Sequence, residues 1–167
     1  MPKAINHIAV SVTDIHQAMR WYRDTLGMTV LVNPVEISFP ASNARDSKTS
    51  ELVRTIFGPK FGRLLISHLS SANGVGIELF QFIEPKAERR AGDSNFEFWR
   101  TGFFHIAVTD PLIEELAERI ETSGGKKRTE VMELAEGSGK KICFCEDPDG
   151  NIIEIYSHSY EQFWSNM

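Results

Sequence analysis

Cysteine is scarce in this sequence. The only two, Cys143 and Cys145, stand two residues apart in a segment that is typical of a β-strand. Alternation along a strand puts both thiols on one face, in a geometry too constrained for an easy disulfide. A Cys-x-Cys pair can be half of a zinc site, but no second pair is present to complete it. We therefore expect both cysteines to be small buried side chains.

An excess of basic charge and a long apolar run are also missing. The 18 Lys and Arg residues are scattered among 23 acidic ones, for a net charge of −5. Phosphate binding needs a basic patch, so we expect no nucleic-acid partner. No apolar run approaches the roughly 20 residues that cross a bilayer, and residues 1–3 lead directly into a strand rather than a signal peptide. The sequence predicts a cytoplasmic protein with no membrane partner.

What the sequence does contain is a repeat. The pattern His-Ile-Ala-Val begins at His7 and again at His105, and each copy is followed by a glutamate between apolar residues, Glu78 and Glu154. A single histidine on an apolar strand is ordinarily a core residue, but a carboxylate buried without a partner is very costly. Two histidines and two glutamates at matching positions favour metal ligation, because a cation removes the burial cost of both carboxylates.

Hydrophobic periodicity predicts the same element order, strand, helix and three strands, in both halves. Asp14 is expected to cap the first helix, and Asp110, with Pro111 at the first helical position, the second. Strands are expected at 5–12, 28–39, 62–69, 74–83, 103–109, about 126–134, 140–146 and 151–158. The prediction is an α+β protein of two βαβββ modules in a single domain, 1–167. Module one spans about 5–84, the linker 85–101 and module two about 102–160.

The halves differ in the connection 40–61, which is longer than most loops and therefore predicts a lid or pocket wall. An apolar helical face is expected in it, made of Leu52, Val53, Ile56 and Phe57. We expect it to cap one side of a metal cavity and to make room for a substrate with a sizeable apolar part. Aromatic residues of the linker, Phe96, Phe98 and Trp99, are expected to pack against the sheet.

Three motifs carry a resemblance to a known family. They are the two His-Ile-Ala-Val strands, residues 21–27 (Trp-Tyr-Arg-Asp-Thr-Leu-Gly) and residues 146–154 (Glu-Asp-Pro-Asp-Gly-Asn-Ile-Ile-Glu). The chain resembles the vicinal-oxygen-chelate superfamily, which includes glyoxalase I, methylmalonyl-CoA epimerase, fosfomycin-resistance proteins and extradiol dioxygenases. The resemblance covers nearly the whole chain apart from 40–61 and the tail after residue 160.

The resemblance implies two βαβββ modules whose curved mixed sheets enclose a metal cavity. It also implies His7, Glu78, His105 and Glu154 as the ligands of one divalent ion, which is Zn, Ni, Co, Mn or Fe, since ligand affinity order alone does not choose among them. Extradiol dioxygenases and fosfomycin-resistance proteins use two histidines and one glutamate. Glu78 therefore favours the glyoxalase branch. Family precedent suggests a homodimer, with the modules paired within a chain or exchanged between chains.

The function that this resemblance implies is a metal-dependent lyase or isomerase of the glyoxalase type. The metal would act as a Lewis acid that stabilises an enediolate, while Glu78 or Glu154 loosens and moves a proton between neighbouring carbons. The expected small-molecule substrate is a 2-oxoaldehyde–thiol adduct or a related hydroxycarbonyl compound. Two alternatives stay open: an Fe(II)-dependent extradiol ring-cleavage dioxygenase, and a non-enzymatic drug-binding protein of the same fold.

Other residues are candidate substrate contacts by position alone. Tyr156 and His158 share strand parity with Glu154 and can face the same cavity. His68 lies in a neighbouring predicted strand, and Arg45 and Arg54 lie near the expected lid, where they can hold an anionic substrate. For each of these residues, ordinary packing or surface exposure is the alternative interpretation.

Overall fold

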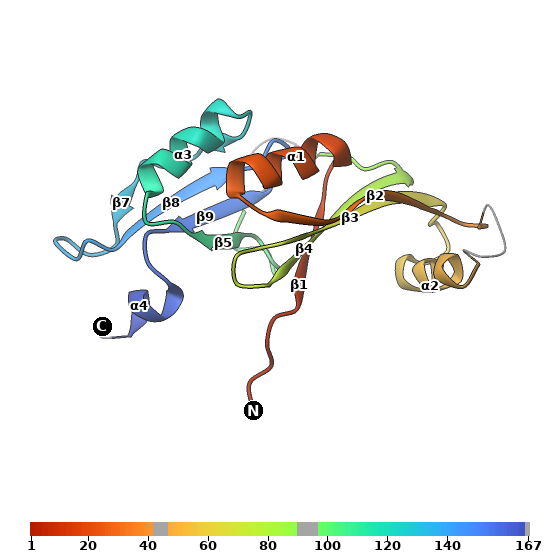
Figure 1. Cartoon of the computed structure of the whole chain (residues 1–167), viewed down its shortest axis with the longest axis horizontal. Helices are drawn as coiled ribbons and strands as arrows, with labels where there is room; N and C mark the ends of the chain where they lie inside the picture. The colour runs from red at the N-terminus through yellow and green to blue at the C-terminus, as the bar shows by residue number, and fades with distance from the viewer. Residues whose placement is uncertain (42–46, 90–96, 166–167) are drawn as a thin grey trace. The chain divides into compact units, whose positions relative to one another are not determined.

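The computed structural model describes residues 1–41, 47–89 and 97–165, so Arg45 and Phe96, two of the residues considered above, lie outside the described residues. The chain divides into two compact units, Met1–Arg89 and Arg90–Met167, called module one and module two below. Both contain a mixed sheet with helices, which is the predicted α+β fold (Figure 1). No helix among the described residues is long and apolar enough to cross a membrane.

Module one is built on a four-stranded sheet. Its strands are β1 (His7–Ser11), β2 (Thr29–Ser38), β3 (Arg63–Ser70) and β4 (Gly76–Glu84). Their order in the sheet is β1-β4-β3-β2, with β1 parallel to β4 and the other neighbours antiparallel. Together with helix α1 (Ile15–Leu26), this is the predicted βαβββ order. The first and last strands of the module therefore lie side by side.

Helix α1 covers one face of this sheet. The carboxylate of Asp14 accepts a hydrogen bond from the backbone N–H of Gln17 at 2.9 Å, as the sequence predicts for the helix start. Gly27 ends the helix at φ 68°, a left-handed conformation that glycine adopts without strain. Ile15 and Tyr22 are fully buried beneath the helix. The backbone N–H of Ile15 donates to the side-chain oxygen of Gln81, which shares a face of β4 with Leu79, so α1 lies on the face opposite to Glu78.

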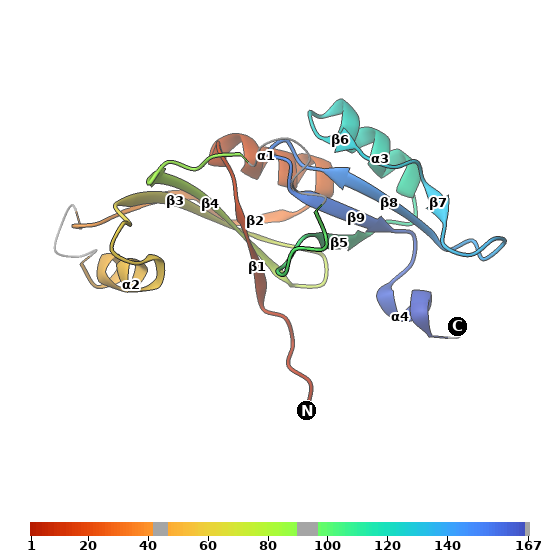
Figure 2. The same ribbon diagram turned by 180° about the vertical axis from the view of Figure 1, so that it is seen from behind.

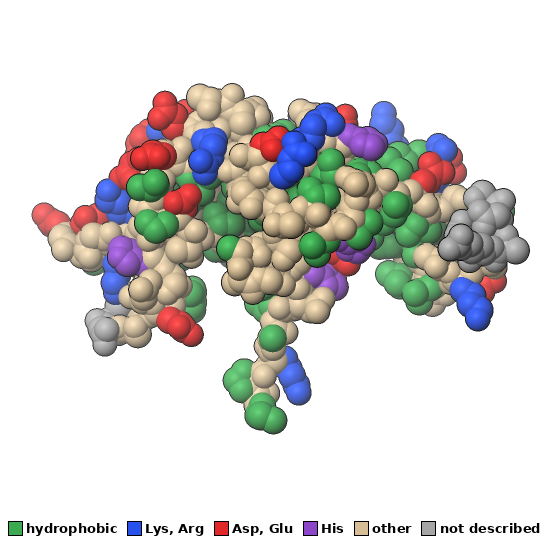
Figure 3. Space-filling model, in the orientation of Figure 1, with side chains coloured by type: hydrophobic (Ala, Val, Ile, Leu, Met, Phe, Trp, Pro, Cys, Tyr) green, Lys and Arg blue, Asp and Glu red, His purple; other side chains and the backbone are tan. Residues whose placement is uncertain are grey.

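The connection 40–61 contains the predicted helix, α2 (Ser47–Phe57), which lies on the other side of the sheet from α1 (Figures 1 and 2). Its Val53 packs with Phe61 and Leu64 in a small core. Only part of the expected apolar face is buried, since Leu52 and Ile56 are 60% and 63% exposed. Hydrophobic side chains accordingly gather on the surface over β2 and beside α2 (Figure 3).

Module two repeats this plan with a more broken sheet. Its elements are β5 (Ile106–Thr109), α3 (Ile113–Thr122), β6 (Lys126–Lys127), β7 (Met132–Glu133), β8 (Lys141–Glu146), β9 (Ile152–Tyr156) and α4 (Tyr160–Trp164). The strand order is β5-β9-β8-β6, with β7 also paired to β8 and β5 parallel to β9. Helix α3 covers one face of the sheet, and the short helix α4, which the sequence analysis did not predict, lies on the other (Figure 2).

Two local predictions for module two are wrong. The single strand expected at 126–134 is two short strands, because the backbone N–H groups of Arg128 and Thr129 both donate to the Phe144 carbonyl and interrupt the regular ladder. Asp110 does not cap the first turn of α3. Its carboxylate accepts from the backbone N–H of Leu112, and the helix begins only at Ile113, so Pro111 precedes it.

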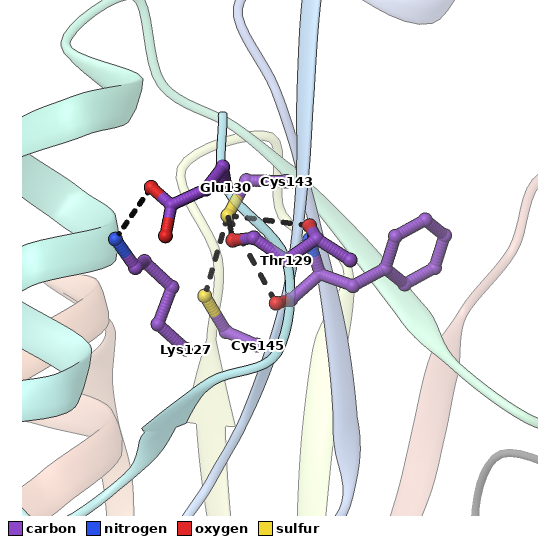
Figure 4. A network of polar contacts seen from close by, with 6 residues as sticks. Lys127, Thr129, Glu130, Cys143 and Cys145 are labelled. Atoms are coloured by element: carbon purple, nitrogen blue, oxygen red, sulfur yellow. Dashed lines mark hydrogen bonds and ion pairs between the residues drawn. The ribbon is translucent and has the colours of Figure 1, made fainter. Parts of the chain in front are cut away.

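The two cysteines are free and fully buried, as predicted. Their sulfur atoms lie 3.8 Å apart on one face of β8, and the Cys143 thiol also donates to the Thr129 carbonyl (Figure 4). The hydrogen bond between the two sulfurs lowers the pKa of Cys143 and raises that of Cys145. The register pairs them with Ile155 and Ile153, so they face the core beneath α3 and away from Glu154.

Candidate metal centre

In module one, the parallel pairing of β1 with β4 brings His7 to Glu78. The register places Glu78 opposite Ala9, two residues after His7 and therefore on the same face. His7 Nε2 lies 3.3 Å from Glu78 Oε2. Gly76 stands directly opposite His7, where an added Cβ would come within 3.0 Å of the His7 Cβ. A glycine there leaves room for the imidazole ring.

The other ring nitrogen of His7 is held by its neighbour in the chain. His7 Nδ1 lies 2.8 Å from the side-chain oxygen of Asn6. An amide oxygen can only accept a hydrogen bond, so this contact requires a proton on Nδ1, and in the neutral ring it leaves Nε2, on the side of Glu78, able to bind a cation. Metal-ligating histidines are typically oriented in this way by a hydrogen bond at the second nitrogen. Sequence analysis missed Asn6, although its place directly before His7 was a usable signal.

Module two builds the same pair from β5 and β9. Glu154 lies opposite Ala107, two residues after His105, and His105 Nε2 is 3.2 Å from Glu154 Oε2. Glu154 is buried, with 6% of its surface exposed. Burial raises the pKa of its carboxyl, against the attraction of His105 and a hydrogen bond with Tyr156, which both lower it. A carboxylate in this position favours a cation beside it.

The surroundings of His105 differ from those of His7. Its ring centroid lies 4.9 Å from that of Phe104, 5.9 Å from that of Phe144 and 6.5 Å from that of Phe98. Its buried Nδ1 has no hydrogen-bond partner among the described residues. The histidine of module one is therefore oriented by an amide, and that of module two by packing against aromatic rings. Phe98 packs as expected for the linker, whereas Trp99 is 80% exposed, contrary to the prediction.

Two of the candidate substrate contacts lie against the carboxylates. His68 stands opposite Glu78 on β3, with its Nδ1 3.4 Å from Glu78 Oε1. Tyr156 is hydrogen-bonded to Glu154, and burial, followed by the charge of Glu154, raises the pKa of this tyrosine to about 12. Its hydroxyl is therefore neutral at physiological pH and can donate to Glu154. A direct contact of either residue with substrate stays a prediction.

The two other candidates have partners within their own modules. His158 Nδ1 lies 2.8 Å from the Ser157 hydroxyl. The Arg54 guanidinium donates to the Phe61 carbonyl at 2.8 Å and stacks 4.4 Å above the Phe39 ring. Within the described part of the chain, neither residue contacts Glu78 or Glu154. A role for them in substrate binding stays a prediction as well.

In each module, a helix outside the repeated βαβββ order contacts the residue two positions after the glutamate. Phe57 of α2 packs edge-on against Phe80 with ring centroids 5.7 Å apart. Phe163 of α4 packs edge-on against Tyr156 at 4.6 Å. Because residues two apart on a strand share a face, α2 and α4 both lie on the carboxylate face of their sheets.

The donor atoms of each pair fit a divalent cation. Two ligands on adjacent positions of one ion, with bonds of about 2.0–2.2 Å, have their donor atoms about 3 Å apart. The observed N–O separations of 3.3 and 3.2 Å match this spacing and are longer than a strong charge-assisted hydrogen bond. Within the described ranges, no three His, Cys, Asp or Glu side chains are gathered to hold a metal. The pair of His7 with Glu78 and the pair of His105 with Glu154 each offer one nitrogen and one oxygen.

Comparison with known proteins agrees with the resemblance found in the sequence. The family model of the Glyoxalase/Bleomycin resistance protein/Dioxygenase superfamily matches residues 4–155. Glyoxalase I of Saccharomyces cerevisiae is 27% identical over 168 residues, and the chain, 94% of which is aligned, spans 45% of that protein's length.

Solved structures share the fold. A glyoxalase family protein from Bacillus cereus matches with a TM-score of 0.70 and 16% identity, over 91% of each chain. Glyoxalase I from Zea mays matches with a TM-score of 0.61 and 23% identity, over 93% of this chain and 44% of the maize chain. The chain therefore spans less than half the length of the yeast and maize proteins.

Proposed function

Because the chain belongs to the Glyoxalase/Bleomycin resistance protein/Dioxygenase superfamily, we propose that it is a metal-dependent lyase or isomerase of the glyoxalase type. The observation that supports this most directly is the His–Glu pair at the same register in both modules, His7 with Glu78 and His105 with Glu154. In this proposal the two pairs together hold one divalent ion, Zn, Ni, Co, Mn or Fe. Their mixed imidazole and carboxylate donors suit these metals.

A complete site needs one pair from each kind of module. We propose a homodimer, in which the pairs meet either within one chain or between two copies. The duplicated pairs support this, because a second copy supplies a second set of both.

The proposed chemistry moves a proton between neighbouring carbon atoms of a carbonyl compound. The bound cation supplies Lewis-acid stabilisation of the negative charge that develops on the substrate oxygens. Glu78 or Glu154 takes the proton from the carbon next to the carbonyl and returns it one atom away. A carboxylate already oriented by a histidine does this with less further ordering.

The proposed substrate is a 2-oxoaldehyde–thiol adduct or a related hydroxycarbonyl compound with a sizeable apolar part. Helix α2 supports the apolar part, because Phe57 lies on the Glu78 face of its sheet and contacts Phe80. The rings of Phe98 and Phe104 beside His105 offer further apolar surface in module two. We propose that α2, the part of the connection 40–61 that contacts Phe80, forms one wall of the substrate site, while residues 42–46 of that connection lie outside the described residues.

The decisive experiment combines metal analysis with an assay. The proposal expects metal in the gently purified chain, loss of that metal in the double variant His7→Ala/His105→Ala, and turnover of hemithioacetals by apo protein reloaded with Zn, Ni, Co, Mn or Fe(II). An absence of metal in the wild type would instead favour a non-enzymatic binder. Oxygen uptake with a catechol in the Fe(II)-loaded protein would replace the lyase by a dioxygenase.

A further inference from the structure

The two carboxylates have different neighbours across the sheet. Glu78 stands opposite Ala9 on the parallel strand and opposite His68 on the antiparallel strand. Glu154 stands opposite Ala107 and Phe144 in the same arrangement. His68 and Phe144 therefore occupy the same position in the repeated fold. An imidazole stands beside the carboxylate in module one, where module two has a phenyl ring.

His68 gives Glu78 a second contact, on the oxygen that His7 does not face. His7 Nε2 lies 3.3 Å from Oε2, and His68 Nδ1 lies 3.4 Å from Oε1. The terminal torsion of a glutamate is soft, so a single contact leaves the carboxylate free to rotate. Contacts on both oxygens restrict that rotation. Separations slightly longer than a hydrogen bond are common at such sites before the ligand is bound and shorten on binding.

Module two holds its carboxylate by another route. Tyr156 follows Glu154 by two residues on β9, shares its face and is hydrogen-bonded to it. The same position in module one is Phe80, since Phe80 pairs with Ser11 as Tyr156 pairs with Thr109. At these two equivalent positions, module one therefore has His68 and Phe80, whereas module two has Phe144 and Tyr156. Each carboxylate thus has one polar partner in addition to the histidine of its pair.

We propose that His68 is a positioning residue for Glu78. It contacts Oε1 and keeps Oε2 directed to the side of His7, so that Glu78 presents one oxygen to the cation. This inference rests on the proposed metal-binding function and concerns module one alone. Polar groups that orient metal ligands typically change metal affinity about 10- to 100-fold when they are removed.

The test measures metal affinity without any substrate. Apo full-length chain is titrated with Co²⁺ and with Zn²⁺ against a chromophoric chelator, and the visible spectrum of bound Co²⁺ is recorded. His68→Phe, which introduces the residue that module two carries, is expected to weaken binding of both ions about 10- to 100-fold. His68→Asn is expected to recover most of this loss, because its amide N–H can reach Oε1. His16→Asn, at an exposed position on α1, is the matched control and should bind like the wild type.

A double-variant cycle separates positioning from a general structural effect. If His68 acts through Glu78, then His68→Phe changes affinity much less in a Glu78→Gln background than in the wild type. Equal effects in both backgrounds would overturn the inference. Wild-type metal affinity in His68→Phe would also overturn the inference. So would a His68→Asn variant that binds metal as weakly as His68→Phe, because that result would make His68 a metal ligand itself.

The metal titrations, together with the hemithioacetal assay, test this inference separately from the proposed reaction. A wild-type chain that binds Co²⁺ and depends on His68, but turns over no hemithioacetal, supports the positioning role and contradicts the lyase. A chain that turns over substrate and binds metal equally well in His68→Phe contradicts only the positioning role. A wild-type chain that binds neither ion contradicts both.

Discussion

At Glu154, burial and ionisation oppose each other. The carboxyl is buried between strands, and its pKa is raised although His105 and Tyr156 both favour the charged form. A group with a higher pKa in the folded chain binds more protons when folded. The free energy of unfolding therefore decreases as the pH rises from the ordinary value of 4.5 through the raised pKa. Burying the charged carboxylate thus lowers the free energy of unfolding of the metal-free protein, and a bound cation would offset this loss.

The first prediction follows from this decrease in the free energy of unfolding with rising pH. In metal-free protein at pH 7, Glu154→Gln should raise the melting temperature, because a neutral amide avoids burying a charge. The rise should be about 2–4 °C for each kcal/mol of removed cost. Below about pH 4 the wild-type carboxyl is protonated in both states, and the difference should vanish. Glu118→Gln, on the exposed side of α3, is the control, and scanning calorimetry at both pH values is the measurement.

The second prediction concerns the same variant with metal and substrate. If Glu154 is a ligand and a proton carrier, Glu154→Gln should lower kcat at least about 100-fold, while circular dichroism shows an intact fold. Glu78→Gln is the matched variant in module one and should also lose activity. Full turnover in either variant would exclude that residue from the chemistry.

At the scale of elements, two helices outside the repeated order shape the carboxylate faces. Helix α2 reaches Phe80 through Phe57, and α4 reaches Tyr156 through Phe163. They come from different parts of the chain, one from the connection 40–61 and one after the last strand. Both are therefore additions to the repeat that contact an equivalent position.

The third prediction tests α4. Phe163 is fully buried, whereas Trp164, the next residue, is 42% exposed. Phe163→Ala should lower the free energy of unfolding by about 3–5 kcal/mol, because it leaves a cavity beside Tyr156. Trp164→Ala should cost much less, and urea unfolding of the two variants provides the comparison. Equal losses would show that α4 is not held by its buried ring.

The fourth prediction tests α2 as a wall of the substrate site. Phe57→Ala should raise KM for the adduct of a bulky aromatic 2-oxoaldehyde, with little change in metal affinity. KM for the small methylglyoxal adduct should change less, and the wild type should turn over the aromatic substrate better. Thr55→Ala, at an exposed position outside the apolar face of the same helix, is the control. An unchanged KM in Phe57→Ala would mean that α2 only packs against its sheet.

At the scale of the whole molecule, metal binding should be visible as stability. A ligand that binds only the folded state adds about 2.7 kcal/mol to the free energy of unfolding at 100 times its Kd. The fifth prediction is that Zn²⁺ or Co²⁺ raises the melting temperature of the wild-type chain and that a chelator reverses the rise. His7→Ala/His105→Ala should show no shift. Light scattering of the same samples should give the mass of a dimer.

The sequence by itself determined the features that depend on local spacing. The two His-Ile-Ala-Val patterns and the two glutamates between apolar residues identified the four residues of both pairs, and strand alternation indicated that each glutamate points away from its apolar neighbours. The N-terminal cap of α1, the presence of α2 and the burial of both cysteines also followed from neighbouring residues. These features need few contacts between distant residues.

Only the tertiary structure decided which residues meet across strands. The position of His68 opposite Glu78 depends on the long-range register of β3 on β4, which hydrophobic patterning does not specify beyond its parity. The break in the predicted strand 126–134 arises because two N–H groups share the Phe144 carbonyl. The contacts of Phe57 with Phe80 and of Phe163 with Tyr156 likewise join side chains from separate elements. Such contacts are set by packing between segments, and no local periodicity encodes them.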